Sequence, residues 1–165
     1  MESSYCERWN FRRVRPVEEL TVEEARERDE RGTLYTAVVG DRNAPDALVE
    51  VVRPNYFGVY FPDHLGRQWQ KFTFRRVDDD RLFLESIIRW QYGDDEARLL
   101  SQAELIEEID YREDGAVHRQ VRDKKAQEKQ DTDYRDVALD INWEPVPEFG
   151  NWASITRFER SAPVE

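Results

Sequence analysis

The sequence contains a single cysteine, Cys6, and no long run of apolar residues. One cysteine cannot form an intrachain disulfide. A lone thiol without an apolar N-terminal leader indicates a reducing compartment, so we expect a cytoplasmic protein. A membrane-spanning helix needs about 18 or more consecutive apolar residues, and no segment approaches that length. We therefore expect no membrane contact.

Histidine is also scarce, and the motifs that carry common chemistry are missing. The two histidines, His64 and His118, occupy a turn and a predicted hairpin, and neither has an orienting partner in the pattern. No phosphate-binding glycine loop, nucleophile elbow, paired-histidine zinc motif or paired-cysteine motif occurs. The sequence thus predicts no catalytic residue, no metal site and no cofactor. An enzyme working through carboxylates is the least favoured class, because with 36 acidic residues proximity alone carries no information.

Negative charge, in contrast, is abundant and unevenly spread. The formal net charge is -11; residues 1–77 are neutral overall, whereas residues 78–114 hold 13 acids against four bases. The electrostatic field of this net negative charge repels the phosphates of nucleic acid, so direct nucleic-acid binding is not expected. Charge runs are usually solvated faces, but they also suit a docking surface for a basic protein. The candidate partner contacts are Asp78, Asp79, Asp80, Asp94, Asp95, Glu107, Glu108 and Asp110.

The length of 165 residues and the aromatic content of 12% predict one folded domain over residues 1–165. We divide it into an N-terminal arm with a surface helix (1–32), a β core (33–92), and a projecting hairpin with C-terminal strands (93–160). The arm, with its mixture of aromatic residues and arginines, fits either an edge strand or an extended segment. Thr21 and Glu24 form a capping box for a helix ending near Arg31, supported by the ion pairs Glu24–Arg28 and Glu27–Arg31.

Strand signals dominate from residue 33 onward. The predicted strands of the β core are 34–39, 47–52, 56–61, 67–77 and 81–92. In the last pair, a three-residue loop at 78–80 places Phe74 opposite Leu84 and fixes the two faces. The predicted core face carries Phe72, Phe74, Leu84, Ile88 and Trp90, while Lys71, Thr73 and Glu85 face solvent.

The remainder of the chain is more ambiguous. Asp114-Gly115 predicts a two-residue hairpin turn that sets Asp110 opposite Arg119. A helix over 101–112 competes with the strand, which we prefer. Residues 123–133 read as a charged loop, whereas 137–143 and 152–158 read as strands. The predicted fold is mainly β, an antiparallel meander curled into a barrel or half-barrel with one or two short peripheral helices.

Two functions follow from these patterns. The leading hypothesis is a non-enzymatic acidic protein that binds and regulates or neutralises a basic protein. The alternative is a small-molecule-binding barrel for an apolar or aromatic ligand, since a few polar groups on an apolar inner face orient a buried ligand. Its candidate residues are Tyr60, Gln68, Gln70, Phe74, Trp90 and Tyr92. The oligomeric state is open.

Overall fold

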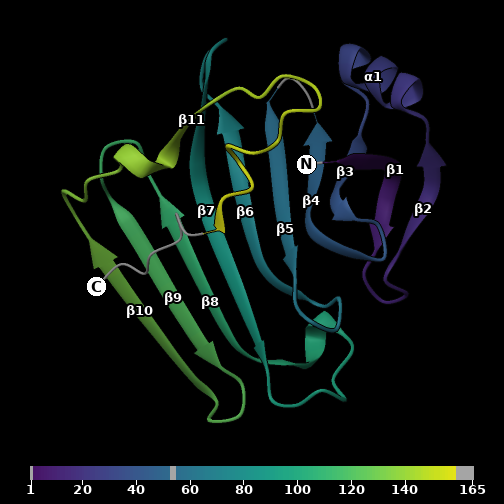
Figure 1. Cartoon of the computed structure of the whole chain (residues 1–165). Helices are drawn as coiled ribbons and strands as arrows, with labels where there is room; N and C mark the ends of the chain where they lie inside the picture. The colour runs from purple at the N-terminus through teal and green to yellow at the C-terminus, as the bar shows by residue number, and fades with distance from the viewer. Residues whose placement is uncertain (1, 53–54, 159–165) are drawn as a thin grey trace.

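In the computed structural model, which describes residues 2–52 and 55–158, all the strands belong to one antiparallel sheet (Figure 1). The strands are β1 (Ser3–Asn10), β2 (Arg15–Leu20), β3 (Tyr35–Asp41), β4 (Ala44–Val52), β5 (Tyr56–Pro62), β6 (Gln68–Arg76), β7 (Arg81–Tyr92), β8 (Ala103–Tyr111), β9 (Val117–Asp123), β10 (Glu128–Tyr134) and β11 (Trp143–Pro145). The helices are α1 (Val22–Arg31) and two 3-10 turns, η1 (Leu100–Gln102) and η2 (Asp140–Asn142).

The spatial order of the sheet is β10-β9-β8-β7-β6-β5-β4-β3-β1-β2, so neighbours in the chain are almost always neighbours in the sheet. Its two edges, β2 and β10, do not pair with each other, and the curled sheet stays open (Figure 1). The predicted mainly β meander is therefore confirmed as a half-barrel, not a closed barrel.

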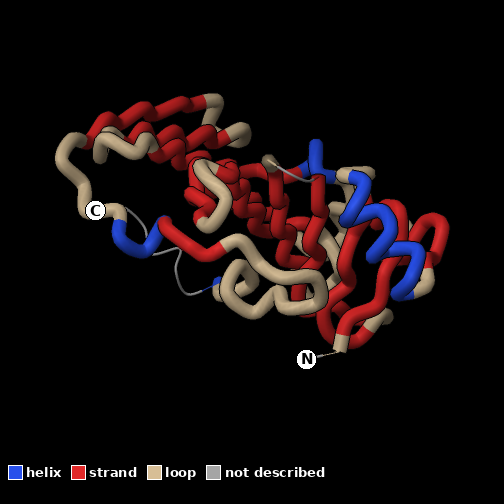
Figure 2. The backbone as a smooth tube through the Cα atoms, turned by 90° about the horizontal axis from the view of Figure 1, so that it is seen from above, coloured by secondary structure: helices blue, strands red, loops and turns tan. Residues whose placement is uncertain are grey.

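The inner face of the sheet, defined by Phe57, Phe72 and Phe74, forms the core. These rings are fully buried, and neighbouring strands add aliphatic side chains at every second position, as strand geometry requires. The C-terminal segment, residues 146–158, lies along one side of the sheet (Figure 2) and packs Trp152 and Ile155 into the same cluster. This segment covers the inner face and completes the core.

Strand β7 changes its partner halfway along its length. Its first residues pair with β11, where Phe83 lies opposite Trp143, and β8 takes over from Ser86 onward. The β6–β7 register shifts at the same place, so Glu85 is an extra residue in a bulge. Asn142, which is buried, donates from Nδ2 to the carbonyl oxygen of Leu84 at 2.9 Å and satisfies that acceptor beside the bulge.

Because of this bulge, the predicted core face is wrong for the second half of β7. Phe74 lies opposite Leu84 as expected, but beyond the bulge Phe72 lies opposite Ile87. Ile87 is therefore buried in the core, whereas Ile88 is only half-buried on the outer face. Trp90 follows Ile88 onto the outer face, because side chains alternate along a strand. The extra residue reverses the inward and outward positions for the rest of β7.

Helix α1 begins and ends where the sequence predicts. Thr21 Oγ1 accepts from the Glu24 backbone N–H at 3.1 Å, Glu24 Oε2 accepts from Thr21 N–H at 2.8 Å, and Gly32 ends the helix with a φ of 70°. The ion pair between Glu27 and Arg31 is present. The predicted pair between Glu24 and Arg28 is not formed, because Glu24 is used in the cap and Arg28 reaches Glu7 and the Leu34 carbonyl.

The β8–β9 hairpin forms, and residues 103–111 are strand rather than helix. Its register differs by one residue from the prediction, since Asp110 lies opposite His118, not Arg119. The turn contains three residues: Arg112 N–H donates to the Ala116 carbonyl, and Gly115 adopts a φ of 90°. A glycine in this conformation is typical of three-residue hairpin loops.

Three further predictions in the second half of the chain are wrong. Residues 123–133 are predicted as a loop, but 128–133 belong to the edge strand β10. Its backbone pairs with β9, and it needs few apolar side chains because both its faces are largely exposed. Residues 137–143 instead contain the turn η2, which exposes Ile141 and brings Asn142 to the bulge. Residues 152–158 form turns, in which Trp152 and Ile155 reach the core at helical spacing.

Candidate functional site

The eight acidic candidates do not form one surface. Asp78, Asp79 and Asp80 occupy the turn at the start of β7, and Asp94 and Asp95 follow its end. Because β7 has 12 residues, the two groups lie about 40 Å apart along the strand. Several of these carboxylates already have partners: Asp78 accepts from Arg81 at 2.9 Å, and Asp94 accepts from two backbone N–H groups.

Glu107 is occupied within the protein. It lies on the inner face of β8, where Arg89 Nη1 donates to Oε1 at 2.6 Å and Arg119 Nε donates to Oε2 at 2.7 Å. Burial raises the pKa of Glu107, but the hydrogen bonds from Arg89 and Arg119 outweigh this effect, so the pKa lies below its ordinary value. With 15% of its side chain exposed, Glu107 is a structural anion and not a contact for a partner.

The two remaining candidates, Glu108 and Asp110, lie on the outer face of β8 and join two carboxylates from β10. Asp110 is opposite His118, and His118 is opposite Asp133; in the next row Glu108 is opposite Gln120, and Gln120 is opposite Asp131. We call the four carboxylates Glu108, Asp110, Asp131 and Asp133 the acidic face. The sequence does not predict that Asp131 and Asp133 belong to this face, because only Thr132 and Tyr134 of β10 favour a strand.

His118 is the titratable centre of the acidic face. Its Nδ1 lies 2.8 Å from Asp133 Oδ1, and its Nε2 lies 3.1 Å from Asp131 Oδ1. The hydrogen bond with Asp133 raises the pKa of His118 above its ordinary value, and the charges of Asp133 and Asp131 act in the same direction despite some desolvation. The imidazole therefore takes up its proton at a higher pH than an isolated histidine does, beside two carboxylates.

A shallow hollow of about 350 Å³ opens beside this histidine. Asp110 and Asp133 line it together with His118 and Tyr134, and two arginines, Arg112 and Arg135, border it as well. Arg112 forms an ion pair with Asp114 at 3.7 Å. The hollow gives the acidic face a concave part.

Apolar side chains adjoin the acidic face on β7. Ile88 lies opposite Glu108, and Trp90 lies opposite the buried Ile106, both on the outer face. Each is half-buried and leaves part of its surface to solvent. Exposed aromatic surface with a polar rim is the usual composition of a protein-binding patch.

The six residues of the small-ligand hypothesis are divided between two faces. Phe74 and Gln70 lie buried on the inner face, where Gln70 Oε1 accepts from Arg89 Nε at 2.8 Å. Tyr60 and Trp90 lie on the outer face, with Tyr60 packed against Phe11. The other two, Gln68 and Tyr92, meet at the end of the sheet, where Tyr92 Oη donates to the Gln68 carbonyl at 2.7 Å. The six side chains do not line one cavity.

Gln70 provides one feature of the small-ligand hypothesis, a polar side chain on the apolar inner face. Within the described residues its Nε2 is buried and has no hydrogen-bond partner. The amide lies at the end of the ion-paired row that runs through Arg89 and Glu107 to Arg119. It is a buried polar group on the inner face of the sheet.

Comparisons with known proteins add no assignment: no family model matches the chain, and no curated protein or solved structure is detectably similar to it. Among residues 2–52 and 55–158, no group of three histidine, cysteine, aspartate or glutamate side chains is placed to hold a metal ion. No helix in the same part of the chain is long and apolar enough to cross a membrane.

Proposed function

We propose that this is a non-enzymatic, cytoplasmic binding protein that docks a basic protein partner on its acidic face. The hollow beside His118 carries the proposal, because Asp110 and Asp133 flank it and together offer a site for one lysine or arginine of the partner. Their strands are separated by β9, which places the two backbones about 10 Å apart. His118 lies between the two strands on the same face, so a cationic group of the partner would bind beside the imidazole, within reach of both carboxylates.

The neighbouring residues extend this contact beyond a single charge. Glu108 adds a carboxylate in the next row, as does Asp131, which also forms an ion pair with Lys129 at 3.7 Å. Ile88 and Trp90 supply apolar area beside them. Several carboxylates on an open face accelerate the association with a basic molecule, and burial of the apolar area slows its dissociation.

The pH dependence of binding follows from the raised pKa of His118. Above that pKa the imidazole is neutral and does not offset the charge of the four carboxylates. Below that pKa the imidazolium adds one positive charge and reduces the net negative charge of the acidic face. We therefore expect affinity for a basic partner to fall as pH falls through the pKa of His118. Binding measured between pH 8 and about pH 5.5 checks this. His118→Gln should remove the pH dependence; if the variant keeps it, another group is responsible.

The proposal is tested by comparing what is recovered with the native chain and with two variants of equal net charge. Glu108→Gln/Asp110→Asn/Asp131→Asn/Asp133→Asn neutralises the acidic face, and Asp79→Asn/Asp80→Asn/Asp95→Asn/Glu96→Gln neutralises four exposed carboxylates elsewhere. A basic partner identified with the native chain by mass spectrometry should be lost from the first variant and kept by the second. Equal recovery with both variants, or partners that are all acidic, would contradict the proposal.

A further inference from the structure

The hairpin formed by β1 and β2 carries a group of arginines that have no acidic partner among the described residues. Arg8, Arg12, Arg13 and Arg15 form no ion pair with any described carboxylate. Elsewhere in this acidic chain, arginines such as Arg67, Arg75 and Arg81 are ion-paired. Four unpaired guanidinium groups on one hairpin are therefore available to an anion from outside.

The tip of this hairpin is fixed in place. Val14 adopts a φ of 49°, a strained conformation for a β-branched residue. Its side chain packs so closely on Gly66, in the β5–β6 turn, that a Cβ atom at position 66 would lie 2.6 Å from Val14 Cγ1. Arg13 N–H donates to Asn10 Oδ1 at 3.0 Å, and Phe11 packs on Tyr60. These tertiary contacts maintain the strained backbone at Val14 and thereby position the neighbouring Arg13 and Arg15.

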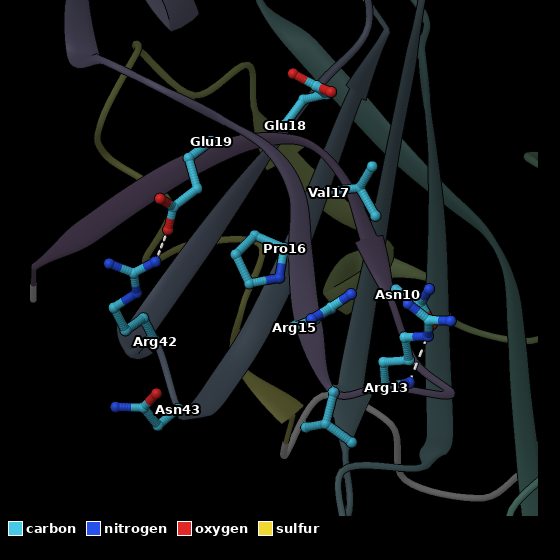
Figure 3. A pocket seen from close by; sticks show the side chains of 10 residues that line it. Asn10, Arg13, Arg15, Pro16, Val17, Glu18, Glu19, Arg42 and Asn43 are labelled. Atoms are coloured by element: carbon cyan, nitrogen blue, oxygen red, sulfur yellow. Dashed lines mark hydrogen bonds and ion pairs between the residues drawn. The ribbon is translucent and has the colours of Figure 1, made fainter.

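Beside the tip lies a hollow of about 850 Å³ between β2 and the β3–β4 turn (Figure 3). Arg13, Arg15 and Arg42 line it together with the amides of Asn10 and Asn43. Arg42 forms an ion pair with Glu19, whereas the other two arginines form none within residues 2–52 and 55–158. The second acidic residue of the lining, Glu18, lies at the opposite end of the hollow from Arg13 and Arg15 (Figure 3).

The geometry of β2 restricts what can occupy this hollow. β2 is an edge strand, and an extended peptide could in principle add to it. Pro16, however, has no N–H to donate, and Glu18 adopts a left-handed conformation with a φ of 54°, which makes the backbone of β2 irregular at that point. Recognition must therefore come from the side chains around the hollow.

We propose that this hollow binds a small phosphate-bearing molecule. The guanidinium fork matches a phosphoryl group with two parallel hydrogen bonds, and a phosphate monoester carries about 1.5 to 2 negative charges against one for a carboxylate. Unpaired Arg13 and Arg15 supply two positive charges, with Arg42 beside them. A volume of about 850 Å³ lies within the usual range for small-ligand pockets, so an organic phosphate fits with its phosphoryl group at the arginines.

The test uses inorganic phosphate and pyrophosphate, titrated into the native chain by calorimetry at low salt. We expect saturable pyrophosphate binding, weakened at least about tenfold in Arg13→Gln/Arg15→Gln. It should be unchanged in Arg98→Gln/Arg122→Gln, which removes two exposed arginines elsewhere. A third arm titrates a single-stranded oligonucleotide. The proposal is overturned if pyrophosphate does not saturate, if both variants bind it equally, or if only the oligonucleotide binds in a manner that depends on Arg13 and Arg15.

Discussion

Replacing Ile87 with alanine is expected to lower the free energy of unfolding by about 2–5 kcal/mol, whereas the same replacement at Ile88 should cost roughly half as much or less. Ile87 is 1% exposed and lies between Phe72 on β6 and Ile109 on β8, so its truncation leaves a cavity in the core. Ile88 is half-buried on the outer face, where solvent fills the space that is left.

Urea denaturation of the two variants measures this difference directly. The pair is matched, because the residue type and the substitution are identical and the positions are adjacent. A larger loss at Ile88 than at Ile87 would mean that β7 has no bulge at Glu85 and that the faces beyond it are exchanged. Equal losses would also contradict the structure, since both side chains would then belong to packed surfaces.

This bulge marks the limit of what the β-core sequence predicts. The alternation of apolar residues places β3 to β7 within a few residues, and it places Phe74 opposite Leu84 correctly. Two adjacent isoleucines, Ile87 and Ile88, satisfy the alternation in either register, so the pattern does not reveal an extra residue before them. What stabilises the bulge is distant in sequence: Asn142 binds the Leu84 carbonyl, and β11 takes the place of β8.

The candidate site could be predicted only in part, for a similar reason. Glu108 and Asp110 are in the predicted acidic segment, but their partners Asp131 and Asp133 lie on an edge strand whose pairing comes from the backbone. A strand that is exposed on both faces leaves no apolar period to detect. Total charge also misled the prediction at Glu107, where Arg89 and Arg119 neutralise the carboxylate inside the protein.

Reversing the charge of the acidic face is expected to have the largest effect on binding. The substitution of Glu108, Asp110, Asp131 and Asp133 by lysine turns an attractive face into a repulsive one. Association with the basic partner should slow by a factor of ten or more at low salt, which is the order expected when electrostatic steering is lost. The difference from the native chain should shrink as salt is added, because charges more than about 10 Å apart are screened near 0.1 M.

Its control reverses four exposed carboxylates outside the acidic face, Asp79, Asp80, Asp95 and Glu96, and gives the same net charge. Stopped-flow association rates for the two variants separate a local contact from the general field of the molecule. We expect the control to retain most of the native rate. If both variants slow association equally, the acidity acts only through the net charge, and the acidic face has no special part in binding.

Backbone chemical shifts test most directly whether binding is located on the outer face of β8 to β10. The isotope-labelled native chain is titrated with an oligolysine peptide and then with the recovered partner. We expect saturable shifts at Glu108, Asp110, His118, Asp131 and Asp133, with smaller shifts in the turn at 78–80 and the loop at 94–96. Shifts that are centred on that turn or that loop, or that are equal at all acidic positions, would contradict this location.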